Sequence, residues 1–384
     1  MPSDLSPAAA QTRLPVSVIT GFLGSGKTTL LNKLLRHPGM DRTAVVINEF
    51  GEIGIDNALV RQASEDIVLL NSGCLCCTVR GDMVDTLRDL FVKRVRGEVP
   101  PFDRVVIETT GLADPAPILH TLMTDPLLAE RYRLDGVVTT VDSAVGMTEL
   151  DQHVESVKQA AVADRLVLTK TDLVDDEARG RLARRLRAIN PAAPQMPVIM
   201  GDVDPARLFD AGLWNPESKS PDVARWLREE AYEGGHGHHH DHHHDHDHGH
   251  GHHHGHGHGH GHGHDHDRGQ DPHDVNRHDD HIRAFCFTAE KPIPWSSFTL
   301  WMELLASSGG ENLLRVKGLV NVAESEKPVV IHGVQHVFHP PLLLDEWPSE
   351  DKRTRIVFIT RDIERATIEK LFNALIAEEA GSAA

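Results

Sequence analysis

The chain has 384 residues, 40% of them hydrophobic, and a formal net charge of −18 at pH 7 with histidine counted as neutral. This length and apolar content predict two domains, each with a hydrophobic core. The negative charge argues against a nucleic-acid partner, because that binding needs clustered Lys and Arg, and no run of about 18 apolar residues indicates a membrane partner.

Residues 1–13 are small and polar, and we expect a disordered N-terminal extension without the segments of a signal peptide. Residues 14–215 alternate short β-branched apolar runs with amphipathic helical stretches. The expected strands are residues 16–20, 44–47, 104–107, 136–141, 165–168 and 198–200. Strands that are apolar on both faces and separated by helices are typical of a parallel sheet covered on both sides. The predicted fold class of this part is therefore α/β.

The strongest motif follows the first expected strand, where residues 21–29 read Gly-Phe-Leu-Gly-Ser-Gly-Lys-Thr-Thr. A Gly-rich loop between a strand and a helix surrounds phosphates with its backbone N–H groups. We expect Lys27 to reach the β- and γ-phosphates, and the Thr28 hydroxyl to hold Mg²⁺. The other expected nucleotide contacts of the loop are Gly21, Gly24, Ser25, Gly26 and Thr29. Residues 14–215 are thus predicted to form a P-loop NTPase domain with helices on both faces of the sheet.

A second acidic position ends the apolar run Val-Val-Ile at residues 105–107. Glu108 at the tip of this expected strand is a candidate for holding Mg²⁺ or positioning water, so we count it with Lys27 and Thr28 as a candidate catalytic residue. Gly111 follows closely and is expected to sense the γ-phosphate by backbone rearrangement. The alternative is a solvated Glu at a strand end.

Base selectivity is predicted from residues 166–172, which read Leu-Val-Leu-Thr-Lys-Thr-Asp. Asp172 can accept hydrogen bonds from the N1–H and the exocyclic amine of guanine, which adenine cannot donate. The stem of Lys170 can lie over the base plane. Thr169 stands where guanine-binding proteins more often have Asn, so GTP is favoured over ATP while the strictness of that choice stays open.

Three of the four cysteines lie together at Cys74, Cys76 and Cys77. Their spacing is not the Cys-x-x-Cys of redox sites, and thiolates are preferred ligands of Zn(II) and Cu(I). Three sulfurs leave a tetrahedral ion one ligand short, which a partner or a carboxylate such as Glu49 would complete. Structural or redox roles of the thiols are the alternatives. So few cysteines form no secreted disulfide framework, and we expect a cytoplasmic protein.

Residues 216–281 differ sharply in composition and are predicted to be a linker. Within it, residues 236–266 hold 19 of the chain's 28 histidines among Gly and Asp, so no core can form and disorder is expected. The alternatives are a metal buffer and a plain tether. We favour the buffer, because a tether needs only Gly and Ser.

Residues 282–377 are predicted to form a small α+β domain, followed by a tail at 378–384. The expected strands are residues 283–288, 313–320, 328–332, 335–338 and 355–360, and the expected helices are 295–307 and 363–377. Cys286 between two phenylalanines indicates a core thiol. His332 and His336 are expected at ordinary surface or interface positions.

Several runs occur together and in order: residues 20–29, Asn-Glu-Phe-Gly-Glu at 48–52, Gly-Cys-Leu-Cys-Cys at 73–77, Glu-Thr-Thr-Gly-Leu-Ala-Asp-Pro at 108–115, and Thr-Lys-Thr-Asp at 169–172. In these runs, and in 313–318 and 330–335, the chain resembles the CobW-like family of P-loop GTPases, which includes zinc-regulated GTPase metalloprotein activators.

The resemblance implies a Mg²⁺-dependent GTPase that binds Zn²⁺, or Co²⁺ or Ni²⁺, and couples the nucleotide state to metal transfer to a client metalloprotein. It makes Cys74, Cys76 and Cys77 metal ligands, and it makes Lys27, Thr28 and Asp172 nucleotide contacts. Glu49 and Glu52 would lie in a switch segment near both sites. Some relatives have a further acidic residue where this chain has Ile47.

Two other functions stay open: a metal-storage or sensing protein that uses the His-rich tract, and an accessory protein for cobalamin synthesis or nitrile hydratase activation. The client and the physiological metal are not specified by the sequence. The oligomeric state also stays open, with a homo-oligomer among the alternatives, as does any exchange of ions between the His-rich tract and the cysteines.

Overall fold

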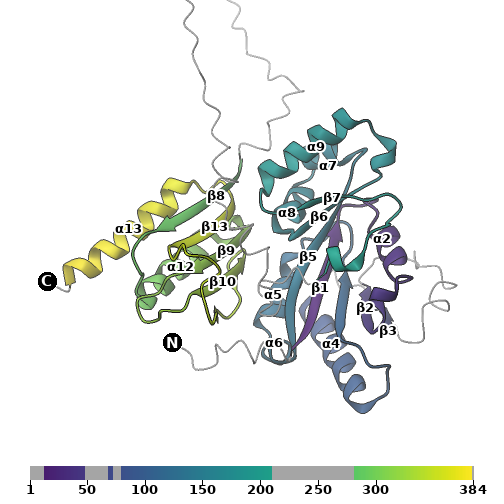
Figure 1. Ribbon diagram of the computed structural model, residues 1–384, viewed down its shortest axis with the longest axis horizontal. Coiled ribbons are helices and arrows are strands. Elements are labelled where there is room, and N and C mark those ends of the chain that lie inside the picture. The colour runs from purple at the N-terminus through teal and green to yellow at the C-terminus, as the bar shows by residue number, and fades with distance from the viewer. Residues whose placement is uncertain (1–12, 48–67, 72–78, 210–280, 383–384) are drawn as a thin grey trace, which may run out of the picture.

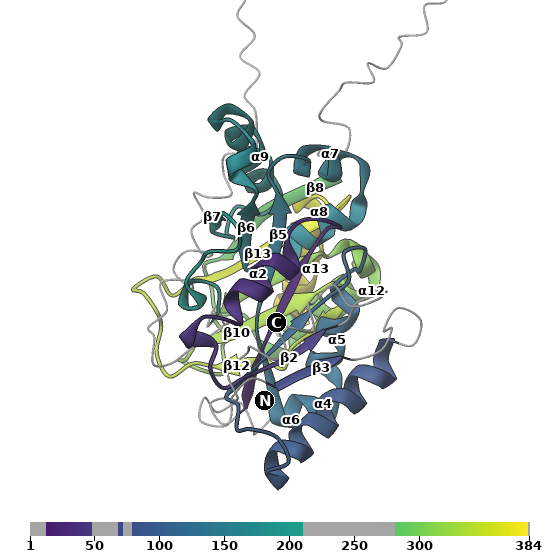
Figure 2. The same cartoon turned by 90° about the vertical axis from the view of Figure 1, so that its right-hand side faces the viewer.

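The structure is a computed structural model that describes residues 13–47, 68–71, 79–209 and 281–382. Several predicted features lie outside these residues: the three clustered cysteines, Glu49, Glu52 and the His-rich tract. The described residues form two sheets with helices, which lie side by side in Figure 1 and one behind the other in Figure 2.

The first sheet has seven parallel strands in the order β3-β2-β4-β1-β5-β6-β7, which confirms the predicted parallel α/β fold. Its strands are β1 (Leu14–Gly21), β2 (Thr43–Ile47), β3 (Val68–Asn71), β4 (Arg104–Glu108), β5 (Tyr132–Asp142), β6 (Arg165–Thr169) and β7 (Gln195–Pro197). Parallel neighbours in such a sheet need long crossover connections, which are usually helical.

Helices cover both faces of this sheet because its strands are apolar on both faces. In β1, Val16 and Val18 pack into a core with α4, α5 and α6, whereas Ile19 packs into a core with α2 on the other face. The helices are α2 (Lys27–Leu34), α4 (Val79–Arg96), α5 (Ala116–Thr124), α6 (Pro126–Arg131), α7 (Gly146–Gln152), α8 (Val154–Val162) and α9 (Asp176–Ile189), with the short helices η1 (Pro38–Met40), η2 (Thr171–Leu173) and η3 (Pro205–Arg207).

The second sheet is antiparallel in the order β11-β10-β9-β13-β8, with β12 paired to β10. Its strands are β8 (Ile282–Ala289), β9 (Arg315–Val320), β10 (Val329–Val334), β11 (Val337–Phe338), β12 (Leu342–Leu343) and β13 (Thr354–Arg361), and its helices are α12 (Trp295–Gly309), η6 (Gly310–Asn312) and α13 (Arg365–Ser382). One face packs on α12 and α13 around the buried Trp301. The separate α+β unit that we predicted is therefore present.

The other face of the second sheet lies against the first domain, next to α5 and α9 in Figure 1. Val334 and Val337, on the β10–β11 hairpin, are buried in the same core as Leu119 of α5. Leu314 and Ile359 are buried with residues of α8 and α9. The interface is thus continuous with two cores of the first domain.

Some predicted boundaries were wrong. Residues 198–200 are not a strand; β7 ends at Pro197, and the chain turns because Met200 and Gly201 have left-handed φ angles of 50° and 74°. The strand predicted at 313–320 begins at Arg315, and the one at 335–338 begins at Val337, because Gln335 and His336 form the hairpin turn. The short strand β12 was not predicted.

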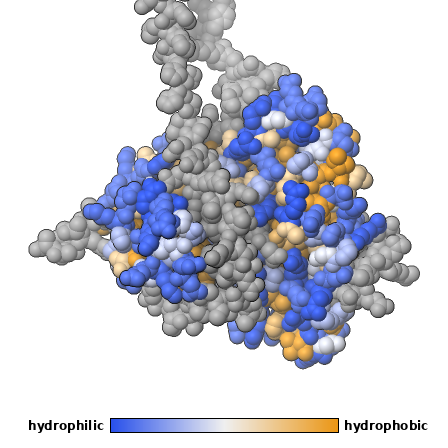
Figure 3. All heavy atoms as spheres, in the orientation of Figure 1, coloured by the Kyte–Doolittle hydropathy of each residue, from blue (hydrophilic) through white to orange (hydrophobic). Residues whose placement is uncertain are grey.

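Among the described residues, no helix has the length and apolar character needed to cross a bilayer. Figure 3 shows a mostly hydrophilic surface on the visible face of the second domain and more apolar residues on that of the first. Cys286 is buried, as expected for a core thiol.

Candidate nucleotide site and its contacts with the second domain

The Gly-rich loop joins β1 to α2, as its sequence context predicted. Gly26 has a left-handed φ of 90° just before the helix, and a Cβ on Gly21 would lie 2.3 Å from Oγ1 of Thr140, so both positions require glycine. The Nζ atom of Lys27 donates to the carbonyl oxygens of Gly21 and Phe22, each at 2.9 Å. The loop is thus closed around the ammonium group that would meet phosphate.

Thr28, in the first turn of α2, lies next to Glu108 at the end of β4. The Thr28 hydroxyl donates to Oε1 of Glu108 at 3.0 Å, and the Glu108 side chain is buried. Strand β4 pairs with β1 with Ile19 opposite Glu108, so both strands end at the same edge of the sheet. A hydroxyl and a carboxylate are the oxygen donors that Mg²⁺ prefers, so this pair fits the ion.

The loop after β4 is held against the Gly-rich loop. The N–H of Thr109 donates to Ile19 O at 3.0 Å. A Cβ on Gly111 would lie 2.8 Å from both Cα and N of Leu23, so only glycine permits this approach. From α8, Nε2 of Gln159 donates to the carbonyl oxygens of Gly111 and Ala113 at 3.2 and 3.0 Å. These contacts determine the position of Gly111, the predicted γ-phosphate sensor.

At the end of β6, Thr169 supports the Gly-rich loop, since its hydroxyl donates to Ser25 O at 2.7 Å. Lys170 has a left-handed φ of 53°, and its Nζ lies 2.5 Å from Oδ2 of Asp142. Asp172 is exposed within η2. The polar end of β6 therefore adjoins the Gly-rich loop, with Asp172 accessible for a base.

Three residues near the loop, Asp142, Glu149 and His153, were missed by the sequence analysis. Burial, and then the neighbouring Asp142, raise the pKa of Glu149 in α7 to about 7, although Lys170 and Lys27 oppose the shift. His153 stacks on Phe22 of the Gly-rich loop with ring centroids 4.5 Å apart. Asp142 could have been noticed as a polar strand end at the same sheet edge as the loop; the other two carry no sequence signal.

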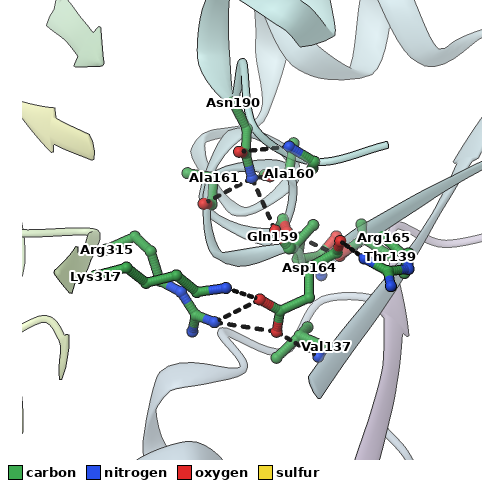
Figure 4. Close-up of polar contacts among 12 residues, drawn as sticks. Val137, Thr139, Gln159, Ala160, Ala161, Asp164, Arg165, Asn190, Arg315 and Lys317 are labelled. Atoms are coloured by element: carbon green, nitrogen blue, oxygen red, sulfur yellow. Dashed lines mark hydrogen bonds and ion pairs between the residues drawn. The ribbon is translucent and has the colours of Figure 1, made fainter. Parts of the chain in front are cut away.

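Across the domain interface, Asp164 forms ion pairs with Arg315 and Lys317 of β9 (Figure 4). Nη2 of Arg315 lies 2.8 and 3.0 Å from its carboxylate oxygens, Lys317 also donates to it, and the N–H of Val137 donates at 2.8 Å. Burial alone would raise the pKa of Asp164, but Arg315 and Lys317 lower it to about 2. Burial lowers the pKa of Lys317 to about 8.

The predicted metal ligands Cys74, Cys76, Cys77 and Glu49 lie outside the described residues. Elsewhere, in the parts of the chain that the structure does describe, no three His, Cys, Asp or Glu side chains form a metal cluster. His332 is buried at the domain interface, and burial holds its pKa well below the usual value, whereas His336 is exposed on the hairpin turn. Both positions agree with a surface or interface role.

The strand register shows where the described strands that precede these ligands in sequence come to an end. Ile47 at the end of β2 pairs with both Asn71 at the end of β3 and Glu108 at the end of β4. Residue 48 follows β2 and residue 72 follows β3. Strands β2 and β3, which precede the predicted ligands in sequence, therefore end at the same edge of the sheet as Glu108.

Comparison with known proteins agrees with this geometry. Residues 15–197 match the family described as CobW/HypB/UreG, nucleotide-binding domain, and residues 282–376 match the cobalamin synthesis protein cobW C-terminal domain. The zinc chaperone YjiA of Escherichia coli is 40% identical over 363 residues, which cover 94% of this chain and 98% of that protein. Zinc-regulated GTPase metalloprotein activator 1 of Schizosaccharomyces pombe is 34% identical over 54% of this chain and 51% of that protein.

Among solved structures, the Zn(II)-bound YjiA GTPase from E. coli superposes with a TM-score of 0.64 over 94% of this chain and 99% of that one. The identity in that structural alignment is 26%. The match to YjiA over nearly the whole length of both chains supports the family assignment, and the two family matches follow one another along the chain. The chain belongs to the CobW/HypB/UreG family of nucleotide-binding proteins and has the CobW C-terminal domain.

Proposed function

We propose that this protein is a Mg²⁺-dependent GTPase that carries Zn²⁺ and delivers it to a client metalloprotein. The observation that carries the proposal is the hydrogen bond from Thr28 to Glu108 at 3.0 Å, where the Gly-rich loop enters α2. It joins a helix N-terminus suited to phosphate with a buried carboxylate on the adjacent strand. The relatives named as a zinc chaperone and as a zinc-regulated GTPase metalloprotein activator support the same proposal.

In this proposal Lys27 exchanges its carbonyl partners for the β- and γ-phosphates of GTP. Thr28 and Glu108 would hold Mg²⁺, which when bound neutralises charge on the phosphates. Gly111, which is held by Gln159, presents the loop after β4 to the γ-phosphate. Hydrolysis then depends on positioning and electrostatics rather than on a covalent intermediate.

Guanine selectivity is assigned to Asp172, which is exposed in η2, just after β6. The carboxylate would accept hydrogen bonds from the N1–H and exocyclic amine of the base. Thr169 acts on the Gly-rich loop through Ser25 and leaves base recognition to Asp172. Lys170 is held by Asp142 at 2.5 Å, which orients its stem for contact with the base.

Zn²⁺ is the cargo in this proposal, bound by Cys74, Cys76 and Cys77 with Glu49 as a candidate fourth ligand. The register of β2, β3 and β4 supports a link to the nucleotide, because β2 and β3, which precede the ligands in sequence, end level with Glu108. A loop that relaxes on hydrolysis would change the metal site. The His-rich tract would act as a reservoir for the same ion.

A titration of zinc with the full chain tests this coupling. We expect different zinc affinities in the presence of a GTP analogue and of GDP, and the difference should vanish in a variant with all three clustered cysteines changed to Ser. Equal affinities in the two nucleotide states would contradict the coupling. A chain that binds zinc without any GTP turnover would instead be a storage or sensing protein.

A further inference from the structure

The turn between β10 and β11 reaches from the second domain to the loop that follows Glu108. Nε2 of Gln335 donates to Oδ2 of Asp114 at 3.3 Å, although the two residues are 221 positions apart. The neighbouring Val334 carbonyl accepts from Nε2 of His120, in the helix that follows this loop, at 2.9 Å. The second domain thus contacts both the loop, at Asp114, and the helix α5 that follows it, at His120.

Asp114 is the point where several contacts on this loop meet. Its Oδ1 accepts from the N–H of Ala116 at 2.9 Å, at the start of α5, and its Oδ2 also accepts from Nζ of Lys158 at 2.9 Å. Lys158 precedes Gln159, whose amide holds Gly111 and Ala113. Asp114 therefore lies within the same set of hydrogen bonds that places Gly111 against the Gly-rich loop.

The backbone of Gln335 is unusual for its residue type. Its φ is 52°, in the left-handed region that glycine adopts at no steric cost, and its side chain is buried. A hairpin turn alone would be better served by Gly or Asn. A strained residue that persists at a buried turn indicates a role for its side chain, and here that side chain faces Asp114.

We propose that Gln335 is a positioning residue for GTP hydrolysis, acting from the second domain through Asp114 on the loop between Glu108 and α5. The inference rests on the proposed function, since it concerns the GTPase reaction. It assigns the second domain a part in hydrolysis in addition to any role in metal transfer. By linkage, a nucleotide that moves this loop also changes how the hairpin is held.

Replacement of Gln335 by Gly tests the proposal cleanly. Glycine suits the left-handed turn, and Val334 and Val337 remain to anchor the hairpin, so the domains should stay docked. With the full chain, GTP and Mg²⁺, we expect kcat to fall about 3- to 30-fold. The affinity for GDP should stay within twofold, because the hydrogen bond of the Gln335 side chain is to Asp114, outside the Gly-rich loop.

The matched control is Asp362→Gly, at another left-handed position of the second domain, where φ is 57° and the side chain is exposed. It should leave kcat unchanged. The Asp114→Asn variant should lower kcat, and combining it with Gln335→Gly should produce little further loss, because both changes interrupt one path.

A fall in kcat of less than threefold for Gln335→Gly would overturn the inference, as would an equal loss of GDP affinity, which would indicate general damage. A wild-type chain without GTP turnover would overturn the proposed function and this inference with it. An active wild type with an equally active Gln335→Gly variant would overturn the inference alone.

Discussion

Arg315 of the second domain donates through Nη2 to both carboxylate oxygens of Asp164, at 2.8 and 3.0 Å, and Asp164 immediately precedes β6. The other end of β6 carries Thr169, whose hydroxyl supports the Gly-rich loop. One strand of five residues therefore connects the domain interface to the candidate nucleotide site.

Replacing Asp164 with Ala should strongly destabilise the docked protein. Arg315 and Lys317 would remain buried without their carboxylate, and the loss of one partner from a buried ion pair costs about 3–5 kcal/mol. Urea unfolding followed by tryptophan fluorescence measures this loss, since Trp301 reports on the second domain. The control Asp103→Ala removes a pair with Arg42 in which both side chains are more than half exposed, at 59% and 51%, and should cost about 0–1 kcal/mol. Equal losses in the two variants would contradict the importance of the interface pair.

Changing Lys27 to Ala should lower kcat for GTP about 100- to 1,000-fold, because the ammonium is the nearest cation to the expected phosphates. The matched control is Lys33→Ala in the same helix, whose half-exposed side chain pairs with Asp202 at 3.4 Å. A phosphate-release assay measures kcat for both variants. Similar turnover in the two would exclude Lys27 from the reaction.

Replacement of Asp172 by Ala should lower GTP affinity about 10- to 100-fold and leave ATP affinity unchanged, since hydrogen bonds to a charged acceptor are lost only for guanine. Competition of GTP and ATP against a fluorescent nucleotide gives the ratio. The exposed Asp176→Ala, at the start of α9, is the control. A parallel loss for both nucleotides would show that Asp172 does not select the base.

Glu149 should make stability depend on pH between about 4.5 and 7. Burial raises its pKa to about 7 in the folded chain, so the folded state binds more protons than the unfolded state in this window. Its contribution to stability is present below about pH 4.5 and is lost as the pH rises through about 7. In wild type, the free energy of unfolding measured in urea should therefore fall between pH 5 and pH 7.5. In Glu149→Gln this fall should be smaller, because the titrating carboxyl is gone. An unchanged pH profile would argue against a buried, protonated carboxyl.

Local patterns predicted most of the first domain. The Gly-rich loop and the strand that ends at Glu108 follow from residues adjacent in sequence, and the parallel order then brings Thr28 to Glu108 because β1 and β4 are neighbours. The interface could not be predicted in the same way. Asp164 and Arg315 are 151 positions apart, and no motif or periodicity around either residue predicts that the two will pair.

Boundaries failed where backbone conformation outweighed side-chain character. Ile199 and Met200 resemble the end of a strand, yet they are exposed, and Met200 already turns the chain with its positive φ. Gln335 lies in the strand that the sequence predicts at 335–338, but the structure has it in a turn. Its role in a turn depends on the pairing of Val334 with Val337, which only the folded hairpin defines.

The buried contacts between the domains bear on residues 210–280, the stretch that joins them in sequence. Asp164, Arg315 and the β10–β11 hairpin already hold the two domains together. The docking of the domains therefore does not require a short linker. Mutations that lengthen, shorten or recompose this stretch would then leave the architecture intact. The histidine content of this stretch can therefore vary without loss of the contacts between the domains.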